Sequence, residues 1–411
     1  MGKVRKAAVN FIFITVLLDV IGFGIIIPVL PQLLAEMNQI SVNEASTYGG
    51  YLLTAFAIFQ FIFSPIMGSL SYQYGRRPIL LLSLLGFALD YLILALAPTF
   101  LWLLIGRIIA GICGASFTTA SAYIADVSDE TNRAKNFGML GAAFGLGFII
   151  GPLLGGFFGE IAVRLPFYVA AGLTFVNFLY GYFILPESLS VDNRRQFDWK
   201  RANPVGTLKQ LFSYKKIGFL LFVFFLLNLA AHAVNTNWAY FNMYLFEWSE
   251  STVGLSLALA GILIALAQAV LAQKIENTLG TEKGLYLGIF LYGLGMFCFA
   301  FASASWMMFL FIVPYCLGSI CGPLLQSYLV EQVAKNEQGE LQGGLTSIQS
   351  LTTIFGPIIM TSIFFFTTKE DTPVYFPGSA FLLAAVLMGA GLLITYWVFG
   401  KQKVNKQEVA L

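Results

Sequence analysis

Long, nearly uninterrupted apolar runs dominate the hydrophobic pattern of this 411-residue chain. A helix needs roughly 20 mainly apolar residues to cross the hydrocarbon core of a bilayer. Twelve runs are of about that length, and most of the polar gaps between them are short. We therefore predict an all-α membrane protein with twelve transmembrane helices, over residues 7–34, 47–70, 79–97, 101–123, 137–159, 166–185, 217–242, 252–273, 284–303, 306–329, 344–366 and 378–399.

The one long gap, residues 187–216, is polar and basic, and it divides the chain in two. We expect a six-helix bundle over residues 1–186 and a second six-helix bundle over residues 217–411. The gap itself is then a cytoplasmic linker between the bundles.

A repeated motif indicates that the two bundles are pseudo-symmetric. The stretch from Gly138 to Gly151-Pro152 has the same internal spacing as the stretch from Gly343 to Gly356-Pro357. Parallel repeats about an axis along the membrane normal are an architecture of secondary transporters, with the substrate site between the halves. The repeat therefore favours alternating access over a simple pore.

Lys and Arg gather in the loops on one side of the predicted helices, as cytoplasmic loops do. These loops and tails hold Lys3, Arg5, Lys6, Arg76, Arg77, Arg133, Lys135, Arg194, Arg195, Lys200, Arg201, Lys209, Lys215, Lys216, Lys274, Lys283, Lys335, Lys401, Lys403 and Lys406. The opposite loops hold only Arg164 and Lys369. This asymmetry predicts a multi-pass protein of the inner (plasma) membrane with both termini cytoplasmic.

Composition narrows the class of protein further. The chain is 58% hydrophobic and 11% charged, whereas a soluble domain carries roughly 25% charged residues. The net charge of +2 gives no indication of nucleic-acid binding. The four cysteines, Cys113, Cys298, Cys316 and Cys321, fall in apolar stretches and are interpreted as packing residues. We expect no metal site, no cofactor and no cleavable signal peptide.

Charged residues inside the predicted helices are the first candidates for function. Asp19 and Asp90 lie deep in apolar segments, where a carboxylate is a functional hypothesis because a low dielectric favours its neutral form. Such a group could load and release a proton, and Asp19 is the leading candidate. Asp90 has a structural alternative, a hydrogen bond to a neighbouring helix. Arg107 lies in an equally apolar stretch, where a cation is costly unless it finds a partner or reaches the outer headgroups.

Uncharged polar residues gather in the predicted segment 217–242. Asn228, His232 and Asn235 follow i, i+4, i+7 spacing and share one helix face. Such a face does not suit lipid, so we expect it, together with Asn237, to line the central cavity. His232 is the only histidine of the chain and could carry a proton, although a lone histidine can equally be a hydrogen-bonded structural residue. Further candidate cargo ligands are Gln60, Gln268, Gln326 and Gln349.

Three segments carry a resemblance to a known family. They read Gly68-Ser-Leu-Ser-Tyr-Gln-Tyr-Gly75-Arg76-Arg77-Pro78, Gly106-Arg107-Ile-Ile-Ala-Gly111-Ile-Cys-Gly114 and Gly145-Leu-Gly147-Phe-Ile-Ile-Gly151-Pro152-Leu-Leu-Gly155-Gly156. They resemble signatures of the major facilitator superfamily, and the third resembles that of its drug:proton antiporters. The stretches Leu18–Pro31, Ser83–Tyr91 and Gln338–Gly343 resemble the tetracycline-resistance efflux pumps.

The first and third of these segments have a physical interpretation of their own. Arg76 and Arg77 follow a tight turn at Gly75, and Asp126 is the carboxylate with which they could pair. The alternative is that both arginines only anchor the topology. Glycines and Pro152 in the third segment allow close helix packing, which is compatible with conformational switching.

The resemblance also has departures. The family has an Asp where this chain has Tyr72, so a full charge relay in that loop is not expected. Tetracycline exporters carry a His and an acid where this chain has Ile264 and Gly293. The resemblance therefore implies that proton coupling depends on Asp19, Asp90, Arg107 or His232.

These observations predict a monomeric proton-coupled antiporter that exports a lipophilic small molecule, with a tetracycline-like drug as the first candidate. Its partners would be that molecule, protons and the lipid bilayer. A second hypothesis is the same fold carrying a siderophore, sugar or peptide, with import as a possible direction. A channel and a membrane enzyme are disfavoured, because of the repeat and because no catalytic constellation is present. A non-transporting sensor would leave the buried acids unexplained.

Overall fold

The computed structural model describes residues 2–114, 116–129, 132–197, 217–334 and 337–409. Every regular element in these ranges is a helix. Residues 198–216 of the predicted linker, with Lys200, Arg201, Lys209, Lys215 and Lys216, lie outside the described residues, as does Lys335.

Eleven helices of the described chain are long and apolar enough to cross a membrane. They cover Val9–Asn38, Val42–Tyr74, Arg76–Leu96, Phe100–Val127, Lys135–Ile161, Leu165–Ile184, Gly218–Phe246, Glu250–Ala300, Ser305–Glu331, Gln338–Phe366 and Ser379–Lys401. Each of the twelve predicted segments overlaps one of them.

The difference in count arises from the span Glu250–Ala300, which contains 51 residues. At 1.5 Å per residue it would be about 75 Å long if straight, far more than a bilayer requires. Gly280 breaks it, because its φ of +79° and ψ of 162° are not helical and suit only glycine well. The break lies between the predicted segments 252–273 and 284–303, so the long span contains both.

Contacts divide the chain into two compact units. Unit 1 comprises residues 1–204 and 248–258, and unit 2 comprises residues 205–247 and 259–411. The start of α10 (Glu250–Leu266) therefore belongs with unit 1, whereas the sequence assigned it to the C-terminal half.

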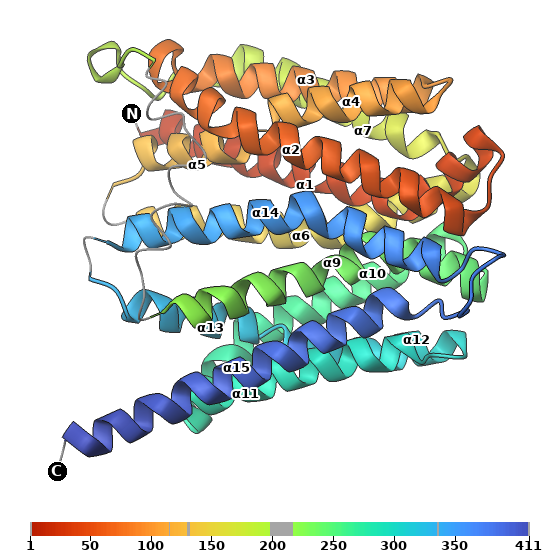
Figure 1. The fold of residues 1–411 in the computed structure, drawn as a ribbon. Helices are drawn as coiled ribbons and strands as arrows, with labels where there is room; N and C mark the ends of the chain where they lie inside the picture. Colours follow the sequence, from red (N-terminus) through yellow and green to blue (C-terminus); the bar gives the residue numbers. More distant parts are fainter. Residues whose placement is uncertain (1, 115, 130–131, 198–216, 335–336, 410–411) are drawn as a thin grey trace. The chain divides into compact units, whose positions relative to one another are not determined.

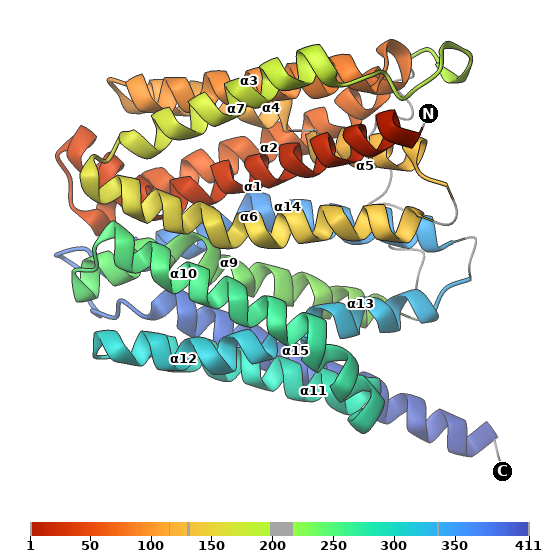
Figure 2. The same ribbon diagram turned by 180° about the vertical axis from the view of Figure 1, so that it is seen from behind.

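In unit 1, α1 (Gly2–Asn38) packs along α6 (Arg133–Ile161), as Figures 1 and 2 show. Glycines allow this approach. A Cβ at Gly151 would lie 2.7 Å from the carbonyl oxygen of Ile21, and a Cβ at Gly24 would lie 2.8 Å from Cδ of Pro152. Any side chain at either position would push the two backbones apart.

The other helices of unit 1 pack in pairs. One pair is α2 (Val42–Tyr74) with α4 (Phe100–Cys113), and the other is α3 (Arg76–Leu96) with α7 (Leu165–Ile184). The predicted segment 101–123 is interrupted near Gly114, so that α5 (Ser116–Val127) continues it as a separate helix.

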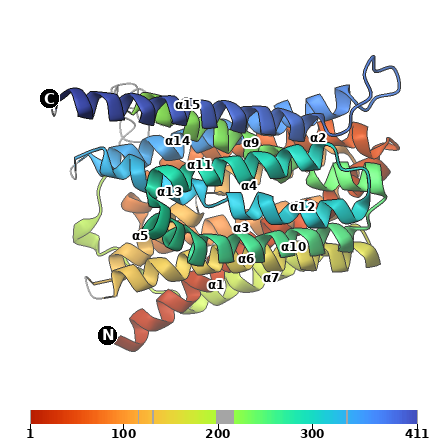
Figure 3. The ribbon, with the colours of Figure 1, turned by 90° about the horizontal axis from the view of Figure 1, so that it is seen from below.

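In unit 2, α9 (Gly218–Phe246) packs against α14 (Gln338–Phe366) and α15 (Ser379–Val409). Next to them, α11 (Ala272–Ala300) lies between α15 and α12 (Ser305–Gly318), as Figure 3 shows. The predicted segment 306–329 is interrupted like its counterpart in unit 1, and α13 (Cys321–Glu331) continues it. The core holds an aromatic cluster in which Trp238 contacts Phe299 and Phe381 edge to face.

Candidate functional site

A buried ion pair joins α3 to α4 in unit 1. Nε of Arg107 donates to Oδ1 of Asp90 at 3.2 Å, and a terminal guanidinium nitrogen donates to Oδ2. Gly106 makes room for the pair, because a Cβ there would lie 2.8 Å from Oδ1 of Asp90. The sequence had left Asp90 and Arg107 as separate candidates, and the packing of neighbouring helices brings them together.

The pairing bears on the alternatives for both residues. Arg107 is 6% exposed and Asp90 is fully buried, so the expectation that Arg107 reaches the headgroups is wrong. Asp90 does make a hydrogen bond to a neighbouring helix, as its structural alternative predicts, and its part in coupling stays a prediction. A charged pair in a bilayer interior needs such mutual compensation, because each ion alone is costly there.

Asp19 on α1 is different, since both carboxylate oxygens are buried without a hydrogen-bond partner among the described residues. The hydroxyl of Ser116, the first residue of α5, is a polar group that interacts with this carboxylate, and no cation pairs with it among the described residues. A buried polar atom without a partner costs free energy and calls for a functional explanation. Asp19 thus remains the leading candidate for a group that binds a proton or a cation.

Tyr91 links these acids and is a residue that sequence reasoning missed. Its hydroxyl lies directly against Gly22, one turn beyond Asp19 on α1. The ring is buried and is close enough to interact with the charges of Asp19, Asp90 and Arg107. Its position next to Asp90 in the sequence was the available signal.

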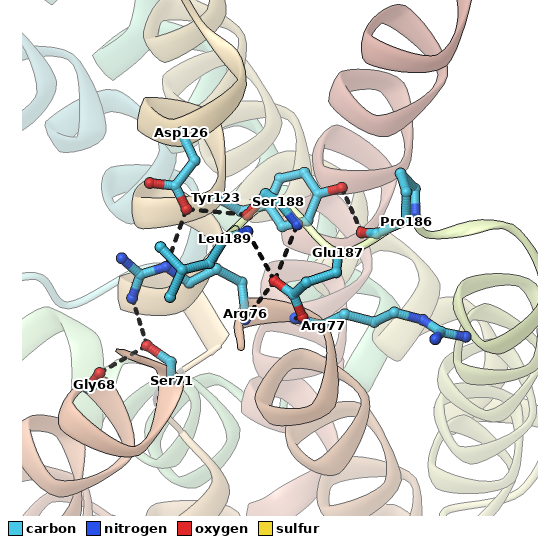
Figure 4. A network of polar contacts seen from close by, with 10 residues as sticks. All are labelled: Gly68, Ser71, Arg76, Arg77, Tyr123, Asp126, Pro186, Glu187, Ser188 and Leu189. Carbon is cyan, nitrogen blue, oxygen red and sulfur yellow. Dashed lines mark hydrogen bonds and ion pairs between the residues drawn. The ribbon is translucent and has the colours of Figure 1, made fainter. Parts of the chain in front are cut away.

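At the other end of α3, a polar network surrounds Arg76 (Figure 4). Nε of Arg76 lies 3.1 Å from Oδ2 of Asp126, and its Nη1 donates to Oγ of Ser71 at 2.6 Å. Ser71 in turn donates to the carbonyl of Gly68. Arg76 is 2% exposed, so it is more than a topology anchor. Arg77 does not pair with Asp126 and instead donates to the carbonyl of Tyr182.

Glu187 is a second member of this network that the sequence did not identify. Its Oε1 accepts the backbone N–H of Arg76 at 2.8 Å, and its Oε2 accepts that of Arg77 at 3.2 Å. Gly75 has a φ of +107°, and a Cβ there would collide with the Glu187 carboxylate. In the sequence, the signal for Glu187 was an acidic residue just after the predicted segment 166–185, on the same predicted side of the membrane as Arg76 and Arg77.

In unit 2, the predicted polar face of α9 is divided among different environments. The ring of His232 packs against Gly356 of α14, and the Asn228 amide donates to the carbonyl of Phe224 one turn earlier. Asn235 is exposed. Asn237 is fully buried, and neither amide atom has a hydrogen-bond partner among the described residues. Of this group, Asn237 has the most unused hydrogen-bonding capacity.

The four glutamines differ in the same way. Nε2 of Gln60 donates to the carbonyl of Gly114 at 3.2 Å, where α4 ends, and so stabilises the break between α4 and α5. Gln326 donates to Gln342, and both are exposed. Gln268 lies in a short π-helical stretch, and it and Gln349 are exposed. Gln60 thus supports the end of α4 with its amide nitrogen, and all four glutamines stay candidates.

Four glycines of the third signature segment, Gly147, Gly151, Gly155 and Gly156, serve packing, whereas a Cβ at Gly145 would meet no atom within 4 Å. Gly155 faces Ile25 and Pro28 of α1, and Gly156 faces the backbone of Glu250 and Ser251 at the start of α10. Small residues at these positions allow the helices to approach each other closely. Gly68 differs, since a Cβ there would meet no atom within 4 Å.

Comparison with known proteins identifies the family. A family model described as the Major Facilitator Superfamily matches residues 12–357 and 220–410. The chain belongs to this superfamily. It is therefore a multi-span membrane transporter with the twelve-helix major facilitator fold.

Two relatives of this transporter are tetracycline resistance proteins. The class C protein of Escherichia coli is 41% identical over 351 residues, which are 85% of this chain and 88% of that protein. The class H protein of Pasteurella multocida is 37% identical over 409 residues, which are 98% and 99% of the two chains. A solved structure of the nucleoside transporter NupG shares the fold, with a TM-score of 0.78 at 12% identity, over 95% of this chain and 100% of that one.

Proposed function

We propose that this transporter exchanges protons for a tetracycline-like drug and that Asp19 is the proton-carrying group. The observation that carries the proposal is the unpaired, buried carboxylate of Asp19. A carboxyl group in such a site can be neutral when isolated from water and charged when water reaches it. Alternating access would provide these two environments in turn.

The Asp90–Arg107 pair is the second part of the proposed coupling site. Tyr91 lies close to both acids, so a change of charge on Asp19 alters the field at the pair. We propose that protonation of Asp19 is sensed in this way by α3 and α4. His232 remains a further candidate, with a ring that packs against α14.

The names of the relatives support the cargo and the direction. Both are tetracycline resistance proteins, and similarity to them extends over most of this chain. A membrane transporter that confers drug resistance has to lower the drug concentration in the cell, so we propose export. We also propose that the chain lies in a bacterial inner membrane with both termini cytoplasmic, which the gathering of Lys and Arg in one set of loops supports. We propose that it works as a monomer, with residues 1–186 and 217–411 as the two moving halves.

Proton movement in proteoliposomes tests the proposal directly. Wild-type protein and Asp19→Asn would be reconstituted with a pH-sensitive dye and given a panel that includes a tetracycline. We expect a tetracycline to move protons through the wild type and Asp19→Asn to be silent. Glu36→Gln is the matched control, because Glu36 is an exposed carboxylate on the same helix.

The possible outcomes separate cargo from mechanism. If Asp19→Asn exports the drug with an undiminished response to the pH gradient, Asp19 is not the proton carrier. If a sugar, peptide or siderophore moves protons and tetracycline does not, the proposed cargo is wrong, but proton coupling through Asp19 still stands. Loss of activity in Glu36→Gln as well would indicate a general effect of neutralising carboxylates on α1.

A further inference from the structure

Tyr72, in the last turn of α2, is held between two arginines. The guanidinium carbon of Arg76 lies 3.8 Å from the Tyr72 ring centroid, and that of Arg195 lies at the same 3.8 Å. Two guanidinium groups at this distance would collide on one face, so they occupy opposite faces of the ring. The charge of Arg76 is compensated by Asp126, which makes a second cation on the ring tolerable.

Arg195 belongs to the segment that follows α7, and this segment is fastened to the loop between α2 and α3 at several points. The backbone N–H of Arg195 donates to the carbonyl of Tyr72 at 3.2 Å. Earlier in the segment, Glu187 accepts the N–H groups of Arg76 and Arg77. Ser188 donates to Asp126 at 3.0 Å. The segment Pro186–Arg195, here called the strap, is thus bound along the network that surrounds Arg76.

We propose that Tyr72 and Arg195 are positioning residues for Arg76, and that the strap is a working part of the cytoplasmic network. The Tyr72 ring fixes the plane of the Arg76 guanidinium, so that Nε faces Asp126 and Nη1 faces Ser71. Arg195 covers the second face of the ring and so ties the strap to it.

This arrangement makes a reciprocal prediction. If the closed strap stabilises the Arg76–Asp126 pair, then that pair must stabilise the closed strap by the same factor. The backbone amides of Arg76, Arg77 and Arg195 report on the strap, because each forms a hydrogen bond between the strap and the turn at Gly75 or the end of α2 while the strap is closed. Their hydrogen exchange measures how often the strap opens.

Hydrogen exchange of the full chain in lipid nanodiscs tests the proposal without any cargo. Tyr72→Leu removes the ring, and Arg195→Gln removes the guanidinium from an exposed position. We expect each to speed strap exchange about two- to fivefold, as loss of an exposed cation–π contact should. The double variant should be no faster than Tyr72→Leu alone. Tyr72→Phe, which keeps the ring, should exchange like the wild type.

Two further variants test the link to the ion pair. Asp126→Ala should speed exchange at Arg195, although Asp126 does not touch that residue. Ser188→Ala removes only the bond from Ser188 to Asp126 and should act mainly near residue 188. Arg133→Gln, an equal change of charge at an exposed cytoplasmic position, should have no effect on the strap.

Three results would overturn the proposal. The first is unchanged hydrogen exchange of the strap in Arg195→Gln. The second is a double variant, Tyr72→Leu/Arg195→Gln, whose hydrogen exchange is accelerated by the product of the two single effects. The third is an Asp126→Ala variant in which the hydrogen exchange of the Arg195 amide is unchanged. The consequence for transport rests on the proposed function. In Arg195→Gln the maximal rate of drug–proton antiport should fall about two- to fivefold, and the KM for the drug should be unchanged. A wild type that moves no drug would refute the proposed function, while the exchange data would still decide the role of the strap.

Discussion

Both units bury neutral polar groups in their helices, but among the described residues the buried charged groups are all in unit 1. Unit 1 holds an ion pair, Asp90–Arg107, and the unpaired acid Asp19. The polar residues of the α9 span in unit 2, such as His232 and Asn237, are amides, hydroxyls and one imidazole. Each intramembrane charge is costly, whereas neutral polar groups cost less and can orient a ligand.

Packing of the matching helices differs as well. Between α1 and α6, Gly151 meets backbone atoms, including the carbonyl oxygen of Ile21 and Cα of Gly24. Between α9 and α14, the corresponding Gly356 meets the side chain of His232. The repeat therefore conserves the glycine and changes what fills the space opposite it. The backbones of α1 and α6 are therefore in direct contact at this glycine, whereas an imidazole ring fills the space between α9 and α14.

The largest effect is expected from breaking the buried ion pair. Asp90→Asn should lower the free energy of unfolding by about 3 to 5 kcal/mol, because it leaves Arg107 charged and unpaired. Arg107→Gln should cost less, because an isolated carboxyl can take up a proton whereas a guanidinium cannot lose one. Thermal unfolding of both variants in detergent measures the difference.

The double variant Asp90→Asn/Arg107→Gln serves as the control for that prediction. It should recover part of the stability lost in Asp90→Asn, since no buried charge remains. Equal losses in the two single variants, with no recovery in the double variant, would mean that packing rather than charge holds α3 to α4.

The next effect compares the two glycines of the repeat. Gly151→Ala should destabilise the protein by about 1 to 3 kcal/mol, because the added methyl group meets backbone that cannot rotate away. Gly356→Ala should cost less, because the imidazole of His232 can adopt another rotamer. Adding His232→Ala to Gly356→Ala should restore stability, and no such rescue is available to Gly151→Ala. Unfolding temperatures of the four proteins test this order.

The sequence predicted the spans well and the contacts between them poorly. Apolar run length is a local property, so the predicted segments 252–273 and 284–303 were distinguishable even though one long helical span contains both. Asp90 and Arg107 were each found as intramembrane charges, but their pairing depends on how α3 packs on α4.

Contacts made by loops were the hardest to predict. Tyr72 was noticed only as a departure from a family pattern, and Glu187 only as the first residue of a linker. Glu187 binds backbone amides and the Tyr72 ring faces guanidinium groups, and such contacts leave no periodic signal in the sequence. The breaks at Gly114 and near Ser319 were missed because a short interruption barely changes the apolar pattern.

A smaller effect of opposite sign is expected at Asn237 in unit 2. Asn237→Leu should raise the free energy of unfolding by about 1 kcal/mol, because it removes two buried amide atoms that lack partners. Transport should nevertheless fall if that amide contacts the cargo. Asn242→Leu is the matched control: its amide donates to the carbonyl of Trp238 at 2.8 Å, so no gain in stability is expected. A stable Asn237→Leu variant with full transport would remove Asn237 from the candidate cargo ligands.

The smallest effect is expected at His232. Its ring packs on Gly356, and it forms no ion pair within the described residues. His232→Gln keeps a polar side chain of similar size, so the transport rate should stay within about twofold and its pH dependence should match the wild type. Proton-coupled uptake into everted vesicles over a range of pH measures both. If the pH profile of transport is shifted in His232→Gln while Asp19→Asn remains active, the proton-coupling group lies in unit 2 and not in unit 1.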